Sequence, residues 1–245
     1  KPLAVSLDHA KQMQTLATKY NIQLITNYET TWYATNHKVK AMVDQNELGQ
    51  LRKMVVRDGH EGPKEIGVSP EFLAWLTDPK LNGGGAVIDF GCYGANLITW
   101  LTHGQRPTSV TAVLQHIKPN IYPKVDDEAI IILEYPGMQG VIQASWNWPF
   151  GRKDMEVYGA TGYVYSDNRS TLRIRLKNDK AEHEEKLKDR EAPFNDPFAV
   201  LAGVVAKQIK LEPYDLSSLE NNMLVVEILE AAIQSSKTGK KVILK

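Results

Sequence analysis

Residues 83–101, GGGAVIDFGCYGANLITWL, join three glycines to an apolar run that carries few polar side chains. In a helix, Asp89, Tyr93 and Asn96 occupy positions i, i+4 and i+7, so they share one face. The other sides are almost entirely apolar, which is typical of a buried helix. A buried polar group without a partner costs about 1–3 kcal/mol, so these three side chains bind one another, nearby backbone or a ligand.

Glycines surround this polar face. Gly91 and Gly94 flank Tyr93 and remove side-chain bulk where a ligand would approach. The glycines at 83–85 do the same at the start of the helix, where free backbone N–H groups attract anions. A core helix with internally satisfied polar groups and a ligand site are both consistent with this spacing.

On the N-terminal side, periodicity predicts a helix over residues 8–21, a short buried strand over 22–29 and a second helix over 33–49. This order is typical of a doubly wound parallel sheet entered part-way. A single strand cannot form a sheet, so we expect its neighbours upstream or in another chain. Residues 1–50 are therefore predicted to be the C-terminal remnant of an α/β domain, and residues 51–245 a second domain.

The second predicted domain is of the α+β class. Helical spacing recurs over residues 69–78, 197–210 and 217–240. Short β-rich runs separated by turns predict antiparallel hairpins, and so an open, mainly antiparallel sheet with helices on one face. The β-rich runs are residues 51–60, 109–117, 128–135, 140–148, 155–160, 162–167 and 171–177.

The composition excludes several classes of partner. Lys+Arg and Asp+Glu are equal at 29 each, so no net charge favours nucleic acid or an anionic membrane. No apolar run approaches the roughly 20 residues of a membrane span. The single cysteine, Cys92, rules out an internal disulfide and favours a reducing compartment, so we expect a cytoplasmic protein, with the periplasm as the alternative. The chain opens on Lys1 without an initiator Met, so we expect a missing upstream segment.

The run at 83–101 resembles the GGGxxxDxGxH/Y signature of the Gfo/Idh/MocA oxidoreductases. Lys1 and Pro2 resemble the end of that family's E-K-P motif, with its Glu upstream. Residues 221–244 resemble the family's C-terminal helix and last strand, and residues 125–164 are similar to its sheet. Together these segments extend the resemblance over essentially the whole chain.

The resemblance implies a nicotinamide-dependent oxidoreductase with an N-terminal Rossmann domain, of which residues 1–50 are the end, followed by a substrate-binding and oligomerisation domain. It implies a sugar, polyol or related hydroxy/keto substrate, and a homo-oligomer, dimer or tetramer, formed through the open sheet. Lys1 matches the catalytic lysine and Asp89 the motif aspartate. Tyr93 stands where most members carry histidine, as in the branch of glucose–fructose oxidoreductase and dihydrodiol dehydrogenase, where a tyrosine is the acid. Asn96 stands where many members carry another aspartate.

These residue types suit hydride transfer. Loss of hydride from a carbinol carbon is coupled to loss of the hydroxyl proton, and a phenol can move that proton if a nearby ammonium lowers its pKa. We expect Lys1 to supply that charge and to bind the substrate oxygen. Asp89 would orient the lysine or the sugar hydroxyls, so that Tyr93 and Lys1 bracket the reacting oxygen.

NAD or NADP is the implied cofactor, yet no phosphate loop is found in these residues. No G-x-G-x-x-G is present, the glycines at 83–85 follow a predicted helix, and GATG at 159–162 is interpreted as a hairpin turn. Only Lys1 and Pro2, joined by an X-Pro bond that could be cis, are predicted to contact the nicotinamide. We expect this chain alone to be inactive.

Four further side chains are candidates for substrate binding, and Asn96 is one of them. Trp146 and Trp148 share one face of a predicted strand, where they would stack on a sugar ring or pack beneath helices. Arg152 would hold an acidic group of the substrate or lie in solvent. His60, in a loop with several glycines, would reach the substrate or remain at the surface.

No metal site is expected, because the histidines form no H-x-x-x-H pair and none joins Cys92 at ligand spacing. The acidic run at 126–128 is interpreted as a solvated strand start. Two other functions stay open. One is a non-catalytic sugar-binding or scaffold module that kept the fold, and the other is an NAD-dependent glycosidase in which hydride transfer is transient.

Overall fold

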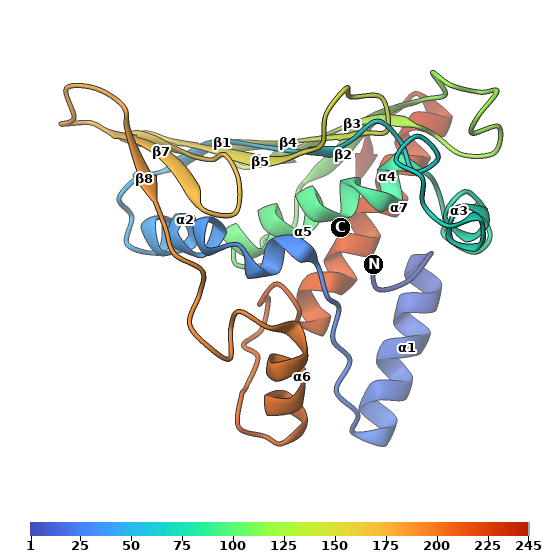
Figure 1. The fold of residues 1–245 in the computed structure, drawn as a ribbon, viewed down its shortest axis with the longest axis horizontal. Helices are drawn as coiled ribbons and strands as arrows, with labels where there is room; N and C mark the ends of the chain where they lie inside the picture. The colour runs from blue at the N-terminus through green and yellow to red at the C-terminus, as the bar shows by residue number, and fades with distance from the viewer. Residues whose placement is uncertain (245) are drawn as a thin grey trace.

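The computed structural model describes residues 1–244, which form one open sheet of nine strands with the helices on one of its faces (Figure 1). The central strand β1 (Leu51–Gly59) pairs parallel with β4 (Met138–Ser145) and antiparallel with β5 (Arg152–Gly159). The other strand pairs within the described residues are antiparallel. The predicted fold class is confirmed.

The sheet grows outward from β1 by hairpins, in the order β8-β7-β6-β5-β1-β4-β3-β2-β9. Each predicted β-rich run contributes a strand, but the run at 140–148 ends early, at Ser145. The remaining strands are β2 (Ser109–Gln115), β3 (Glu128–Tyr135), β6 (Gly162–Ser166), β7 (Thr171–Leu176), β8 (His183–Lys186) and β9 (Val242–Ile243).

Alternation along the strands explains why one face of the sheet is covered. In β3, Ala129, Ile131 and Leu133 are buried, whereas Ile130 and Ile132 are 39% and 36% exposed. Successive side chains of a strand point to opposite faces, so the buried set lies under the helices. We call the face toward the helices the inner face and the opposite one the outer face.

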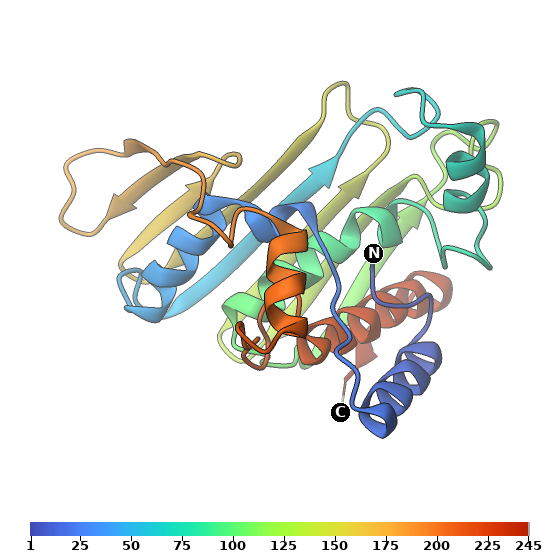
Figure 2. The same ribbon diagram turned by 60° about the horizontal axis from the view of Figure 1, so that its bottom comes forward.

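Two helices cover the centre of the inner face. The helix α5 (Gly91–Leu101) is buried along its whole length and contacts β1 and β4, and α7 (Leu219–Thr238) packs against α5 and β2. Figure 2 shows both lying across the sheet, with α6 projecting in front of it. The other longer helices are α1 (Leu7–Tyr20), which contacts α7, α2 (Ala34–Asp44), which contacts β6, α3 (Pro70–Leu76) and α6 (Pro197–Val205).

The buried helix predicted from the glycine-rich run is broken in two. The short α4 (Ala86–Asp89) and α5 are separated by Phe90. The start of α4 is held by Asp126, whose carboxylate accepts from the N–H of Gly85 at 2.9 Å and of Val87 at 2.7 Å. A Cβ on Gly85 would lie 1.8 Å from the backbone oxygen of Asp126, so only glycine fits there. The glycine entrance therefore serves a close approach between two backbone segments.

The strand predicted over residues 22–29 does not form, and Glu29 begins a 3₁₀ helix instead. Within the described residues no strand pairs with this segment, and Thr26 N–H donates instead to the backbone oxygen of Ser217 at 3.2 Å. The backbone groups of a strand need a neighbouring strand to bond to, so the apolar composition of this segment alone was not enough to form a strand. The domain boundary at residue 50 stays a prediction.

Candidate active site

Lys1, the first residue of the chain, forms an ion pair with Asp89, the last residue of α4. Lys1 Nζ lies 2.7 Å from Asp89 Oδ1 and also donates to the backbone oxygen of Asp89. The second carboxylate oxygen accepts from Nε1 of Trp146 at 3.0 Å. Both oxygens of Asp89 are therefore engaged, and together they fix the position of the Lys1 ammonium.

Tyr93 lies one turn further along the chain, beside the same ammonium. Lys1 Nζ is 4.6 Å from the centre of the Tyr93 ring, and the ring packs edge-on against Tyr28 with 5.5 Å between ring centres. Tyr93 is only 5% exposed, and its hydroxyl takes part in no hydrogen bond among residues 1–244. The hydroxyl is thus free to bind an oxygen of a ligand.

A second ammonium, which was not predicted as part of the site, approaches the same ring. Lys153 Nζ lies 5.2 Å from the centre of the Tyr93 ring and forms an ion pair with Glu29 of the 3₁₀ helix η1 (Glu29–Trp32). The signal that would have found it is the period of β5. Met155 and Val157 are buried on the inner face, so Lys153 points inward as well.

Burial and neighbouring charges set the protonation of these groups. Burial lowers the pKa of Lys1, but Cys92, Asp89 and Tyr93 outweigh this effect and raise it, so Lys1 is an ammonium. Burial raises the pKa of Tyr93, and the opposing effect of Lys1 does not cancel the rise. The prediction of a lowered pKa for Tyr93 is therefore wrong for this chain, and the phenol keeps its proton at neutral pH.

Two predicted site residues are buried away from open space. Trp146 is 0% exposed, and because β4 ends at Ser145 the prediction that it shares a strand face with Trp148 is wrong. It contacts the site through its bond to Asp89 and offers no ring surface for stacking. Asn96 is also 0% exposed and donates to the backbone oxygen of Leu216 at 2.7 Å, so it belongs to the packing between α5 and the segment before α7.

The remaining predicted residues lie at the edge of the site. The Lys1–Pro2 peptide bond is cis. His60 packs edge-on against Phe90 with 4.8 Å between ring centres, and burial lowers its pKa. Arg152 is exposed and paired with Asp154. The structure therefore places His60 beside the residue that follows Asp89, and leaves Arg152 in a separate ion pair.

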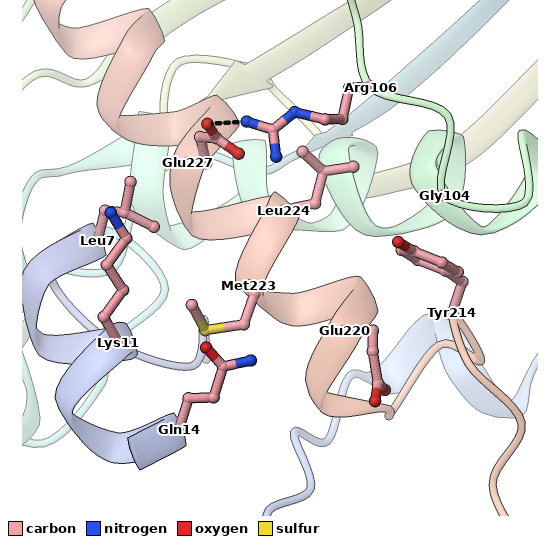
Figure 3. Close-up of a pocket in the computed structure, with 10 residues that line it drawn as sticks. All are labelled: Leu7, Lys11, Gln14, Gly104, Arg106, Tyr214, Glu220, Met223, Leu224 and Glu227. Carbon is pink, nitrogen blue, oxygen red and sulfur yellow. Dashed lines mark hydrogen bonds and ion pairs between the residues drawn. The ribbon is translucent and has the colours of Figure 1, made fainter. Parts of the chain in front are cut away.

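A cavity of about 390 Å³ lies apart from these residues, between α1 and α7, and Figure 3 shows the ion pair of Arg106 with Glu227 at its wall. None of Lys1, Asp89 and Tyr93 lines it. Among residues 1–244, no group of three or more His, Cys, Asp or Glu side chains is placed to hold a metal ion. In the same part of the chain, no helix is both long and apolar enough to cross a membrane.

The sequence is similar to that of trans-1,2-dihydrobenzene-1,2-diol dehydrogenases. Identity is 27% with the Xenopus tropicalis protein and 26% with that of Sus scrofa, each over 146 residues. These matches cover 59% of this chain and 40% of each relative. The chain thus matches less than half the length of these relatives.

Two solved structures show the same fold. The aldose-aldose oxidoreductase of Caulobacter crescentus, complexed with glycerol, superposes with a TM-score of 0.83 at 21% identity. An inositol dehydrogenase homolog of Azotobacter vinelandii, complexed with NADH and myo-inositol, gives 0.81 at 17% identity. Each superposition covers 100% of this chain and 70% of the other.

The family model of the GFO/IDH/MocA C-terminal domain matches residues 36–165, more than half of the chain. The match includes the glycine-rich run, β1, β3, β4 and β5. The chain therefore belongs to the GFO/IDH/MocA family and carries its C-terminal domain.

Proposed function

We propose that this chain is the substrate-binding part of an NAD(P)-dependent oxidoreductase that transfers hydride to or from a hydroxyl-bearing carbon of a sugar, polyol or related compound. The observation that carries the proposal is the placement of the Lys1 ammonium, held by Asp89, beside the protonated phenol of Tyr93. Relatives named for dihydrodiols, aldoses and inositol support this substrate class.

Tyr93 is the proton donor in this proposal. Reduction of a carbonyl to a carbinol needs a proton at the oxygen, and the Tyr93 hydroxyl holds one because burial raises its pKa. The Lys1 ammonium stabilises the negative charge that develops on the same oxygen. In the oxidation direction, Tyr93 must first be a phenolate, and the Lys1 ammonium stabilises this anion. The phenolate oxygen then accepts the proton of the carbinol.

Asp89 and Trp146 are positioning residues for Lys1. A lysine side chain has several rotatable bonds, so it needs fixed acceptors to keep its charge at one point. Asp89 provides two of them, its carboxylate and its backbone oxygen, and the indole of Trp146 holds the carboxylate from the other side. The arrangement fixes the ammonium before substrate binds, which is the condition for electrostatic stabilisation of a transition state.

Lys1 and Pro2 are the residues of this chain that would lie against the nicotinamide, which supplies or accepts the hydride when bound. They fit that role, because Lys1 is held at the candidate site by its ion pair with Asp89. The sequence contains no G-x-G-x-x-G phosphate-loop motif, so we assign binding of the diphosphate to none of its residues. The choice between NAD and NADP is likewise not assigned.

The outer face of the sheet supports the proposal of a homo-oligomer. Val113, Ile130 and Ile132 are 56%, 39% and 36% exposed there, and they lie on neighbouring strands. Apolar side chains gathered on one open sheet face favour association. We also propose a cytoplasmic location, in keeping with the single free cysteine.

The test is to express the protein with its upstream coding sequence, titrate NADH and NADPH by fluorescence, and assay turnover of aldoses, inositols and dihydrodiols. Lys1→Met should lower kcat by about 100-fold or more, since it removes the charge beside the reacting oxygen. Lys19→Met changes an exposed lysine at the end of α1 and should leave kcat unchanged.

Three outcomes would contradict the proposal. Failure to bind either nicotinamide would favour the non-catalytic sugar-binding module. Release of a free sugar from a glycoside, with no net change in NADH, would favour the glycosidase. Full activity of the Lys1 variant would contradict the assignment of the active site to Lys1, Asp89 and Tyr93, but not the membership in the family.

A further inference from the structure

Asp58 is a buried carboxyl group without a partner. It lies near the end of β1, is 2% exposed, and neither of its oxygens has a hydrogen-bond partner in residues 1–244. Its neighbour Arg57 points to the outer face, where it bonds to Asp154 and Glu156. An unpaired buried carboxylate is among the most costly groups to place in a protein interior, so its presence requires an explanation.

Lys153 is the residue directly opposite Asp58 across the β1–β5 ladder. Directly opposed residues of an antiparallel pair project to the same face, so both side chains lie on the inner face. Lys153 nevertheless forms its ion pair with Glu29, with its ammonium 5.2 Å from the centre of the Tyr93 ring. Lys153 can therefore pair with either of two carboxyl groups, that of Glu29 or that of Asp58, and in this structure it pairs with Glu29.

A small cavity joins these groups. Its volume is about 10 Å³, close to the minimum for one water molecule, and Asp58, Lys153, Thr30 and Asn36 line it. The hydroxyl of Thr30 is also buried without a partner. The two unpartnered side chains thus line the same space beside Lys153.

The charge state of Asp58 follows from its surroundings. Burial raises its pKa well above the ordinary value, Lys153 and Lys1 lower it, and Asp89 and Glu29 raise it again. Tyr33, together with Cys92 and Tyr93 of α5, also lies near it, since the charge of Asp58 raises the pKa of all three. Arg57 and Asp154 line the same cavity. Without a bound cation the group is neutral, and ionisation requires an ammonium close by.

We propose that Asp58 is a positioning residue for Tyr93 that acts through Lys153. The neutral form of Asp58 leaves the ammonium to Glu29 and the Tyr93 ring, and the ionised form takes the ammonium for itself. The exchange moves the Lys153 ammonium away from the Tyr93 phenol and adds the negative charge of the Asp58 carboxylate to its surroundings. Both changes make the phenol a weaker acid, so Asp58 sets how readily Tyr93 gives up its proton.

The consequence for Tyr93 rests on its proposed role as proton donor, but the exchange of Lys153 does not. The first experiment therefore needs no activity. The full chain, labelled with ¹³C at aspartate carboxyl and lysine ε carbons, is titrated by NMR, with signals assigned by Asp58→Asn and Lys153→Met. We expect Asp58 to titrate above the ordinary range of aspartates and the Lys153 signal to shift with the same midpoint.

Variants separate exchange from simple burial. Asp58→Asn should leave the Lys153 signal flat across that range. Glu29→Gln frees Lys153 for Asp58 and should lower the Asp58 midpoint. Asp154→Asn alters the carboxylate next to Lys153 on the outer face and should change neither signal. A Lys153 signal that ignores the Asp58 titration, or an Asp58 midpoint unmoved by Glu29→Gln, overturns the proposal. If Asp58→Asn does not fold, Glu29→Gln decides alone.

The second experiment measures turnover of a hydroxy or keto substrate against pH. Asp58→Asn should remove the fall in kcat that accompanies Asp58 ionisation, and Lys153→Met should lower kcat about tenfold, the effect of one pKa unit on the phenol, with KM little changed. Absence of any turnover would count against the proposed function and leave the NMR result standing. A coupled NMR titration with an unchanged pH profile of kcat in Asp58→Asn would remove Asp58 from the reaction.

Discussion

Arg57 and Asp58 are consecutive residues of β1, and their surroundings differ completely because they point to opposite faces of the sheet. On the outer face, Arg57 bonds to Gln143 at 3.0 Å, to Asp154 at 3.2 Å and to Glu156 at 2.6 Å. On the inner face, Asp58 has no partner within the described residues, although Lys153 stands opposite it. We call the first set the outer cluster, and Asp58, Lys153, Glu29 and Tyr93 the inner cluster.

The difference shows which polar groups maintain the fold and which are left for chemistry. Each charged group of the outer cluster has a partner, and solvent lowers the cost of any that loses one. In the inner cluster, Asp58 is buried and its carboxyl group has no hydrogen-bond partner within the described residues, whereas the ion pair of Lys153 with Glu29 is partly exposed. Folding alone does not favour such a combination, and unsatisfied groups in a native interior are concentrated at functional sites.

The largest expected effect of a single substitution is on turnover. Tyr93→Phe removes the proposed proton donor and should lower kcat by about 10²–10⁴-fold. Thermal stability should change little, because the substitution breaks no hydrogen bond among residues 1–244. Tyr165→Phe is the matched outer-face change, beside Arg173, and should leave kcat unchanged. Steady-state kinetics of both variants, with melting curves as the folding control, make the measurement. Equal kinetics in the two variants would erase the contrast between the clusters.

The next largest effect is on stability, at the glycine entrance that holds Asp89 in place. Gly85→Ala puts a Cβ 1.8 Å from the backbone oxygen of Asp126, and the shift needed to relieve the clash should cost about 3 kcal/mol of unfolding free energy. Gly151→Ala is the control, because its Cβ would meet nothing closer than 3.9 Å. Urea unfolding of both variants measures the difference. A Gly85 variant as stable as the control would mean that α4 can move, and with it Asp89.

The sequence predicted the part of the site that depends on local spacing. Asp89 and Tyr93 are four residues apart, and one helical turn keeps them on the same side of the chain even though Phe90 breaks the helix. Asn96 lies in α5 like Tyr93, but its side chain donates to the backbone oxygen of Leu216 instead of reaching the site. Lys1 entered the predicted site only through the resemblance to a family, because no local pattern connects residues 88 positions apart.

The inner cluster could not be predicted from the sequence, for a physical reason. Asp58 and Lys153 meet only because β1 is inserted between β4 and β5, and that register is a non-local property of the sheet. The same limit explains the strand wrongly predicted at residues 22–29, since an apolar run becomes a strand only when another strand lies beside it. The sheet itself was predictable, because short alternating runs and tight turns specify hairpins locally.

A smaller effect should appear in the pH dependence of stability. The native pKa of Asp58 is raised above its unfolded value of about 3.9, so the native state binds the proton more tightly. The free energy of unfolding therefore falls as pH rises from about 4 through the native pKa, by at most about 1.4 kcal/mol per pH unit. Asp58→Asn lacks this fall, so its stability relative to the native sequence should rise with pH over that window. Denaturant unfolding at several pH values tests this, and parallel curves would mean that Asp58 is ionised and paired.

The smallest effect should come from the outer cluster. Arg57→Met removes the guanidinium that bonds to Asp154 and Glu156, and partly exposed ion pairs of this kind contribute about 1 kcal/mol or less each. Burial acts to raise the pKa of Glu156, but the bonds from Arg57 and Tyr158 hold it below its ordinary value, so it should rise in this variant. Salt screens exposed charges, so the stability difference should shrink as ionic strength increases. Turnover and the Lys153 signal should not change, because β1 separates the two faces. A loss of turnover here would show that charge on the outer face reaches Tyr93, and the contrast between the two faces of β1 would then be one of degree.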